Sequence, residues 1–369
     1  MKLEDLKCVS NNVDLDDYLK LYKYVRDNME HPEWLGTFAK KEIIDILNNG
    51  GKIWLYYNDK DLVCSCFYIP VKNKTLIKHN ISYDQSITGS LGPIMVSPDY
   101  VGFGLQRQMM KVYNEYLISL GKKYSFTKVH SDNMYSINNM LKDGYIKTHE
   151  YESERGMNTC FIKDLFNEII NSLEYKEFDT DYISFKGKIP ILFTAPHTMK
   201  QLRKDGSIKL NEPYTKGIAL YLNKYCNVNC MIKLKDTGID SNWDDYDKFK
   251  TEIKRFVKEN NIKLVIDLHG ASNNNDFDVE FGTMNNLSSD FSTVRELEEA
   301  FLENGITNIK YNDPFKGGAI TKSIYGLDDV DVIQIEISSN YRQFNNDNLK
   351  LLVNSLNKFI NQYFKYINR

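Results

Sequence analysis

The sequence predicts an α/β protein of two domains, each built on a sheet that helices cover. At 369 residues the chain exceeds the usual length of a single domain. Hydrophobic residues make up 42% and aromatic residues 13%, with 20 glycines and 8 prolines, a balance typical of packed globular structure. Apolar runs of strand length alternate with helical patterns in both halves. We therefore place a first domain at residues 1–162, a connecting segment at 163–187 and a second domain at 188–369.

The first half mixes helix and strand patterns. Two amphipathic helices are expected at 14–28 and 37–47, and Asn48-Asn49-Gly50-Gly51 ends the second. Runs rich in aromatic and β-branched residues then predict strands, and apolar residues three or four positions apart predict helices between them. The expected strands are 52–57, 62–71, 91–96, 124–130 and 145–152, with helices at 102–120 and 135–142. A mixed sheet partly covered by helices follows.

The second half alternates strands with helices. Its expected strands are 190–194, 231–234, 263–268, 277–281 and 332–337, and its expected helices are 215–225, 246–259, 293–304 and 347–364. This alternation indicates a sheet covered by helices. Such sheets bind their ligands at the carboxyl ends of the strands, so polar residues at those ends are the candidates for a site.

Charge and hydropathy restrict the partners. Basic and acidic residues number 47 and 50 and alternate along the chain, so no broad positive surface is expected and nucleic acid is excluded as a partner. The N-terminus carries acidic residues where a secretory signal needs an apolar core, and no apolar stretch is long enough to span a bilayer. We expect a cytoplasmic protein that acts on small molecules and has no membrane partner.

Six cysteines are dispersed through the chain, which favours reduced and mostly buried thiols over a disulfide framework. Cys226 and Cys230 offer an alternative as metal ligands. No second pair completes the four ligands of a structural zinc site, so we favour the buried thiols.

Two of the six histidines end apolar strands. His197 closes Ile191-Leu-Phe-Thr-Ala-Pro-His197, and His269 lies in Leu264-Val-Ile-Asp-Leu-His-Gly270. Glu212 follows just ahead of an expected helix. Two histidines and one carboxylate form a catalytic zinc ligand set that leaves a position for water. Each also has a structural alternative, since a strand-end histidine can serve packing and Glu212 can favour the positive end of its helix.

Asp267 lies two residues before His269 and on the same face of an extended strand. Its carboxylate can therefore orient the His269 imidazole through a hydrogen bond. The alternative role is that of an acceptor for nearby backbone amides.

Short motifs in the second half follow one another in a recognisable order: Ala-Pro-His197, Asn-Glu212, Asp-Leu-His-Gly270, Glu280-Phe-Gly-Thr283, Asn312-Asp-Pro-Phe-Lys-Gly-Gly318 and Gln334-Ile-Glu336-Ile, with Tyr341. Over residues 188–345 this order resembles the N-formylglutamate amidohydrolase family. The resemblance implies that His197, Glu212 and His269 bind Zn2+ or a similar divalent metal and that Glu336, the general base, activates the attacking water. Because Glu336 alternates with isoleucines, an acid pointing out of the strand is the alternative interpretation.

The resemblance also points to an N-acyl, N-formyl-amino-acid-like substrate. Gly317-Gly318 suits a loop whose backbone approaches a ligand, although paired glycines also make ordinary turns. Lys316, Arg203 and Arg342 are the candidates for binding a substrate carboxylate, with arginine favoured by its bidentate geometry. The chain departs from the family in two respects: the segment that resembles it is shorter, and the loop after His197 reads Thr198-Met-Lys-Gln-Leu-Arg203. The identity of the N-acyl substrate is therefore left open.

A second constellation lies in the first half. Leu91-Gly-Pro-Ile-Met-Val-Ser-Pro98 is a strand that enters a glycine turn, Val101-Gly-Phe-Gly-Leu105, and the turn opens a helix. Amides at such a helix start bind phosphate, and glycines let the phosphate approach the backbone. The alternative is that Gly102 and Gly104 only permit close helix packing in a binding or dimerising module.

Together with Asn133-x-x-Ser136 and Lys142-Asp-Gly144-Tyr145, this pattern resembles the GNAT acetyltransferase superfamily over residues 1–162. The resemblance implies acetyl-CoA as cofactor. It implies that Val101, Gly102, Phe103, Gly104 and Leu105 bind the pyrophosphate, that Val96 pairs with the pantetheine arm and that Asn133 lines the same cleft. Met140 departs from the family, because many members have there the tyrosine that protonates the leaving thiolate.

The sequence thus predicts a bifunctional enzyme, a zinc-dependent amidohydrolase joined to an acetyltransferase that modifies an amine. The alternative is a regulatory protein that binds acyl-CoA and a small carboxylate without turnover.

Overall fold

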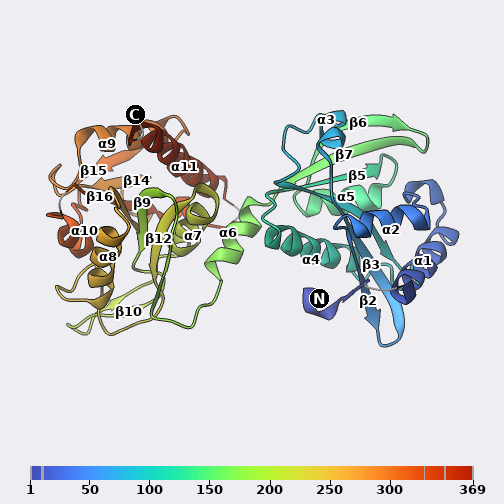
Figure 1. Ribbon diagram of the computed structural model, residues 1–369, viewed down its shortest axis with the longest axis horizontal. Coiled ribbons are helices and arrows are strands. Elements are labelled where there is room, and N and C mark those ends of the chain that lie inside the picture. The colour runs from blue at the N-terminus through green and yellow to red at the C-terminus, as the bar shows by residue number, and fades with distance from the viewer. Residues whose placement is uncertain (1, 10–11, 328, 345, 368–369) are drawn as a thin grey trace. The chain divides into compact units, whose positions relative to one another are not determined.

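The computed structural model describes residues 2–9, 12–327, 329–344 and 346–367. The chain divides into two compact units, Met1–Glu168 and Ile169–Arg369. Each unit contains one large sheet with helices against it (Figure 1). Among the described residues, none of the helices combines the length and the apolar character that crossing a membrane requires.

The sheet of the first unit is mixed and has the strand order β1-β2-β3-β4-β5-β7-β6. Neighbouring strands are antiparallel except β4 and β5, which are parallel. The strands are β1 Lys7–Cys8, β2 Lys52–Asn58, β3 Asp61–Ile69, β4 Thr88–Val96, β5 Tyr124–His130, β6 Ile146–Ser153 and β7 Gly156–Asp164.

Helices cover both faces of this sheet. They are α1 Asn12–Asp27, α2 Lys40–Asn48, α3 Asn73–Lys78, α4 Leu105–Ser119 and α5 Met134–Lys142, with short 3-10 turns at Pro32–Trp34 and Pro98–Tyr100. Apolar residues of α1 and α2 pack on Ile53, Leu55 and Phe67. Tyr116 of α4 packs on Trp54, which alternates with Ile53 and Leu55 along β2 and therefore points to the other face.

β4 and β5 diverge along their length. Among the described residues, the ladder between them covers Thr88–Ser90 of β4 and Tyr124–Phe126 of β5. Beyond Ser90, β4 keeps its bonds to β3 but pairs no further with β5. The edge of β4 from Leu91 to Val96 therefore borders a gap in the sheet.

The second unit has a seven-stranded sheet in the order β15-β14-β16-β13-β9-β12-β8. Its central strands β16, β13, β9 and β12 are parallel to one another, whereas β14 and β8 are antiparallel to their neighbours β16 and β12. The strands are β8 Tyr182–Phe185, β9 Ile189–Ala195, β12 Val228–Lys233, β13 Leu264–Ala271, β14 Val279–Gly282, β15 Ile309–Tyr311 and β16 Asp331–Ser338, and β10 Gln201–Leu202 with β11 Ile208–Lys209 forms a separate hairpin.

Helices pack on both faces of this second sheet as well. They are α7 Thr215–Cys226, α8 Lys248–Glu259, α9 Phe291–Leu302, α10 Ala319–Ile324 and α11 Asp347–Ile367, while α6 Phe166–Glu174 contains the division between the two units. Apolar residues of α8 and α10 pack on Leu192, Val265 and Val332. α7, α9 and α11 pack together on the opposite face (Figure 1). The polar residues of the candidate site lie farther along the same three strands, β9, β13 and β16, toward their carboxyl ends.

The predicted α/β architecture is confirmed, with corrections at the ends of elements. The helix expected at 102–120 begins at Leu105, because Gly102 and Gly104 have φ values of 94° and 71° that a helix cannot contain. The strand expected at 231–234 begins at Val228. Among the described strands and α-helices, those not predicted are β1, β7, β8, β10, β11, β15, α3 and α10.

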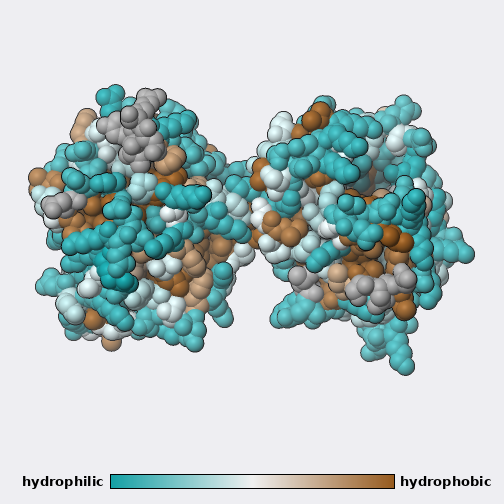
Figure 2. Space-filling model, viewed as in Figure 1, coloured by the Kyte–Doolittle hydropathy of each residue, from teal (hydrophilic) through white to brown (hydrophobic). Residues whose placement is uncertain are grey.

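The surface agrees with the composition. On the face in Figure 2, hydrophilic residues dominate and are interrupted by apolar patches. The described cysteines are free thiols; four are buried, Cys226 is partly buried and Cys8 is exposed.

Candidate functional site

The candidate site of the second unit lies at the carboxyl ends of three parallel strands. His269 of β13 stands opposite Glu336 of β16, and Asp267 stands between Thr194 of β9 and Gln334 of β16. Residues that are paired in a ladder project to the same side of a sheet. These side chains therefore share one face, as predicted from their place at strand ends.

The structure brings His197, Glu212 and His269 together. Nδ1 of His197 lies 2.9 Å from Oε1 of Glu212 and 3.1 Å from Nδ1 of His269. Oε2 of Glu212 lies 3.4 Å from the same His269 nitrogen. All three side chains are at most 4% exposed, and their potential ligand atoms lie within 4.8 Å of one another.

The two other ring nitrogens each face a carboxylate. Nε2 of His197 lies 2.7 Å from Oδ1 of Asp240, and Nε2 of His269 lies 2.8 Å from Oδ2 of Asp267. Ionised carboxylates only accept hydrogen bonds, so each Nε2 carries the proton and donates it. In the neutral imidazoles, both Nδ1 atoms then point lone pairs at the same small space. A cation is the partner that such a pair of acceptors requires.

Glu212 adds a further unsatisfied acceptor. Its Oε2 atom is buried and has no hydrogen-bond donor among the described residues. Burial by itself raises the pKa of Glu212, but the His197 and His269 imidazoles hold that pKa well below its usual value. Burial opposes a charged His269, yet Asp267 and Glu212 raise its pKa well above the ordinary value, so without a metal a proton on Nδ1 takes the place among these acceptors that a cation would otherwise fill. The donor set therefore fits a divalent cation such as Zn2+.

Asp267 is fixed from both sides. It accepts a hydrogen bond from Oγ1 of Thr194 at 2.5 Å while its other oxygen binds His269. A carboxylate held in this way orients an imidazole and makes it a better ligand.

Glu336 is buried beside this ligand set, so it is not an acid that points to solvent. It is 6% exposed and accepts a hydrogen bond from Nε2 of Gln334 at 2.7 Å. Burial raises the pKa of Glu336 to about 7, against the opposing effect of the His269 imidazole. Gln334 in turn accepts from the backbone amide of Gly318 at 2.7 Å. One chain of hydrogen bonds thus links the glycine loop to the candidate base.

The loop of Lys316, Gly317 and Gly318 is held by two of the motif residues. Oε1 of Glu280 accepts from the amides of Asp313 at 2.6 Å and Phe315 at 2.7 Å. Asn312 Oδ1 accepts from the amides of Thr283 and Asn285. Gly317 has a φ of 109°, and a Cβ on Gly318 would stand 2.1 Å from Oδ1 of Asn242. The backbone conformation therefore requires Gly317, and the Asn242 side chain leaves no room for a Cβ on Gly318 in this arrangement.

The candidate carboxylate-binding residues differ in their surroundings. Arg203 donates from Nε to Oδ2 of Asp240 at 2.8 Å, and its guanidinium lies 4.6 Å from the ring centre of Trp243. Arg342 is 6% exposed and donates to the backbone oxygens of Ile337, Pro213 and Ala271. Its hydrogen bonds tie the sheet to the segment that carries Glu212. The contacts of Arg342 are thus those of a residue that stabilises the fold.

Two polar residues of the site were not predicted. Asp240 lies in an acid-rich loop, where nothing in the sequence distinguishes it from Asp236, Asp244 or Asp245. Lys209 binds Oε1 of Glu212 at 2.7 Å and is partly exposed. Its place three residues before Glu212 was the only signal that the sequence offered.

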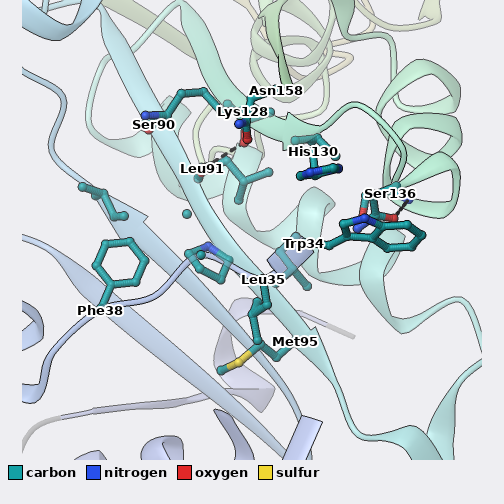
Figure 3. A pocket seen from close by; sticks show the side chains of 18 of the residues that line it. Trp34, Leu35, Phe38, Ser90, Leu91, Met95, Lys128, His130, Ser136 and Asn158 are labelled. Carbon is teal, nitrogen blue, oxygen red and sulfur yellow. Dashed lines mark hydrogen bonds between the residues drawn. The ribbon is translucent and has the colours of Figure 1, made fainter. Parts of the chain in front are cut away.

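The first unit holds a cavity of about 630 Å³ at the gap between β4 and β5 (Figure 3). The β4 edge from Ser90 to Val96 lines it, and so do Asn133 and Met140. Trp34 and His130 lie together on one side of the cavity, with Phe38 farther along it. Asn133 also caps α5, because its Oδ1 accepts from the Ser136 amide at 3.1 Å.

The predicted pyrophosphate loop precedes α4. Gly104 is the N-cap residue of that helix in the left-handed conformation, and a Cβ at Gly102 or Gly104 would meet no atom within 4 Å. Val101 and Phe103 are 70% and 71% exposed, and Leu105 is the first residue of the helix. The loop is thus an open turn with free amides at the start of a helix.

His79, His149 and Cys160 are a second group of potential metal ligands among the described residues; Cys226 and Cys230 belong to neither group. Nδ1 of His79 lies 3.5 Å from the Cys160 sulfur, which matches a thiol-to-imidazole hydrogen bond. Burial lowers the pKa of His79 to about 4, and the nearby Lys128 adds to that effect. A lysine beside this group disfavours a cation there, so we assign the group no ligand.

Comparisons with known proteins give a family match within the second half and structural matches over the first. Residues 235–341 match the family model described as N-formylglutamate amidohydrolase, which confirms the resemblance of the second half over these residues. A comparison with curated protein sequences gives no match.

Solved acetyltransferase structures match the N-terminal part of the chain. One is the ribosomal-protein-S18-alanine N-acetyltransferase of Escherichia coli, 13% identical over 43% of this chain and 93% of that chain, with a TM-score of 0.33. Another is a GNAT-family acetyltransferase of Streptococcus pneumoniae, 12% identical over 43% and 98%, with a TM-score of 0.35. A third is a spermidine N-acetyltransferase of Vibrio cholerae, 12% identical over 45% and 98%, with a TM-score of 0.35.

Proposed function

We propose that the second unit is a metal-dependent amidohydrolase that removes an acyl group from an N-acyl amino acid. In this proposal His197, Glu212 and His269 bind a Zn2+ or similar ion, and Glu336 is the general base. The family match over residues 235–341 supports this class of reaction.

One observation carries the proposal. The Nδ1 atoms of His197 and His269 lie 3.1 Å apart, the Nε2 proton of each ring is fixed by a carboxylate, and the buried Oε2 of Glu212 has no donor among the described residues. Three acceptors that converge without a donor are costly to bury unless a cation binds among them.

The residues around this set supply the other parts of the reaction. A bound divalent ion would lower the pKa of a water molecule and polarise the amide carbonyl. Glu336, in its ionised form, takes a proton from the attacking water and later passes it to the leaving amine. Gln334 holds the Glu336 carboxylate in one orientation, since its amide is fixed by Gly318. Asp240 and Asp267 hold the two imidazoles.

The substrate carboxylate is assigned to Arg203. It is partly exposed, stacks on Trp243 and uses Nε for Asp240, so the outer edge of the guanidinium faces away from that bond. Lys316 is the second candidate, on the loop that Glu280 supports.

The test is elemental analysis of the purified chain beside His197→Ala and His269→Ala, with His31→Ala of the first unit as the matched control. The proposal expects about one zinc or similar ion per chain in the parent and the control, and loss of the ion in both folded site variants. Circular dichroism verifies the folding of each variant. A parent chain that stays free of metal after supplementation overturns the proposal.

We further propose that the first unit transfers an acetyl group from acetyl-CoA to an amine. The free β4 edge, the cavity beside it and the open glycine turn before α4 support this activity. The amine nitrogen attacks the thioester carbonyl, a C–N bond forms and the C–S bond breaks. The thiolate leaves with the electron pair and takes up a proton, while the amine loses one.

A single pair of measurements separates catalysis from the alternative of a regulatory protein. Calorimetry measures acetyl-CoA binding, and release of the CoA thiol measures turnover with a panel of amines. Binding of acetyl-CoA together with thiol release supports the transferase. Binding of acetyl-CoA and of a metal, with neither thiol release nor hydrolysis of N-formyl or N-acetyl amino acids, favours the regulatory alternative.

A further inference from the structure

The cavity of the first unit is lined by basic but not by acidic side chains. Among its described lining residues are Lys72, Lys128, His130 and Arg155, and none is an aspartate or glutamate. Asp132, the acid beside His130 at 3.8 Å, is 79% exposed and does not line the cavity. A concave site with charges of one sign concentrates ligands of the opposite sign.

These cations are not neutralised by the protein. Within the described residues, Lys72, Lys128 and Arg155 form no ion pair with a carboxylate. The guanidinium of Arg155 reaches across to the segment that carries Trp34, where a Cβ on Gly36 would stand 3.2 Å from its NH1 nitrogen. Because Gly36 has no side chain, the Arg155 guanidinium has room beside the cavity.

The pyrophosphate of acetyl-CoA does not account for this charge. The proposed pyrophosphate loop is Val101–Leu105, and none of these five residues lines the cavity. Lys128 and His130 lie on β5 and Arg155 lies in the turn between β6 and β7, whereas Lys72 lies between β3 and α3. An acyl group that reaches the cavity along the β4 edge would meet its acceptor there.

Trp34 adds a flat wall to the same region. Its ring stacks on His31 with ring centres 4.3 Å apart. It lies 6.1 Å from the His130 ring, and Figure 3 shows these two rings near each other. A polyamine would instead need carboxylates to bind its ammonium groups, which the described lining does not supply.

We propose that the acceptor of acetyl transfer is an amine that also carries an anionic group, a carboxylate or a phosphate, and that Arg155 and Lys128 bind this group. The inference rests on the proposed acetyltransferase activity. Planar guanidinium groups bind both anions in a bidentate manner, so the shared chemistry is an amine beside an anion.

The test measures CoA thiol release by the full chain with L-glutamate, glucosamine 6-phosphate, tyramine and spermidine as acceptors. We expect kcat/KM for one of the two anionic amines to exceed that for spermidine at least about tenfold, because a charge-assisted bidentate contact is worth that ratio or more. The first two acceptors distinguish a carboxylate from a phosphate.

Variants assign the effect to residues. Arg155→Gln and Lys128→Gln should each lower kcat/KM for the anionic acceptor about tenfold and leave KM for acetyl-CoA unchanged. Lys60→Gln, in the turn between β2 and β3 and outside the cavity lining, is the matched control and should change neither.

Three results would overturn the inference. One is a preference for spermidine or tyramine, which leaves the transferase itself intact. A second is a rise in KM for acetyl-CoA in the Arg155 and Lys128 variants with no change in kcat/KM for the acceptor. That result would mean that these two side chains bind the cofactor and not the acceptor. The third is an absence of acetyl-CoA binding in calorimetry, which removes the proposed transferase as well.

Discussion

Oδ1 of Asp240 lies 2.7 Å from Nε2 of His197, and the other oxygen of the same carboxylate binds Arg203. The interaction fixes the tautomer that leaves Nδ1 of His197 free to bind a metal. Burial opposes ionisation of Asp240, but the hydrogen bond to His197 and the pairing with Arg203 hold its pKa well below the usual value. Asp240 is therefore an anion at neutral pH.

The change Asp240→Asn should weaken metal binding by about ten- to a hundredfold, because it removes the charge that holds the His197 proton on Nε2. The dissociation constant of Zn2+, measured by competition with a chelating dye, gives the result. Asp245→Asn is the control, since Asp245 is exposed in the same loop and makes no contact with the ligands. Equal affinities in the two variants would remove Asp240 from the metal site.

Replacing Glu336 by glutamine should separate chemistry from metal binding. The variant should keep its metal, because Glu336 is not among the three ligands, and should lose about two to four orders of magnitude in kcat. Steady-state hydrolysis and elemental analysis on the same preparation measure both quantities. Glu299→Gln on α9 is the exposed control. Loss of the metal together with activity would make Glu336 a ligand instead of the base.

The pH dependence of hydrolysis follows from the burial of Glu336. A general base acts when ionised, so activity should fall as the pH falls through its pKa. Burial raises that pKa to about 7, and a cation on the neighbouring ligands can only lower it. The acid limb of kcat/KM should therefore lie at or below pH 7. A limb well above that value would assign the titration to another group.

Arg342 should contribute strongly to stability. Replacing it by glutamine leaves the carbonyls of Ile337, Pro213 and Ala271 without this donor and should lower the free energy of unfolding by about 3 kcal/mol. Arg255→Gln is the matched control, because its ion pairs on α8 are exposed and it should change little. Denaturant titration of the second unit compares them. Equal stability would contradict the structural role.

The glycine turn before α4 should control acetyl-CoA binding. Gly104→Ala places a Cβ on a left-handed residue beside the amides proposed for the pyrophosphate, so the dissociation constant should rise about tenfold. Gly206→Ala is the control, since Gly206 has a φ of 83° and equally open surroundings in the other unit. It carries similar backbone strain without touching the cofactor site. Calorimetry with acetyl-CoA measures the difference.

Periodicity predicted the elements whose cores are strongly apolar. β9, β13 and β16 were expected because each is rich in large apolar residues, and the long helix α11 because its apolar stripe continues over several turns. β7 was missed, since Gly156-Met-Asn-Thr begins with exposed and polar residues and its apolar part follows only later. β15 and α10 are short elements whose structure depends on their neighbours.

The residues of the candidate site also differ in how far the sequence could predict them. His269 and Glu336 lie near the ends of β13 and β16 and His197 lies just after β9, so the apolar strand patterns indicated where all three would be found. Asp240 comes from a loop with no periodicity, and only its contact with a distant histidine distinguishes it from its acidic neighbours. Arg342 was expected to bind a ligand because of its chemistry, and nothing in the sequence indicates the three carbonyls around it.

The amide of Glu212 donates to the carbonyl of His197 at 2.8 Å, so the chain returns to its starting point after the β10 and β11 hairpin. This hydrogen bond holds two of the three proposed ligands, His197 and Glu212, close together. The distance between them therefore does not depend on the length of the segment that connects them. Evolution can then lengthen, shorten or exchange residues 198–211 while the two ligands stay in register. Arg203 and Lys209 still tie the arms of the hairpin to Asp240 and Glu212, so its tip is where changes of length would disturb the site least.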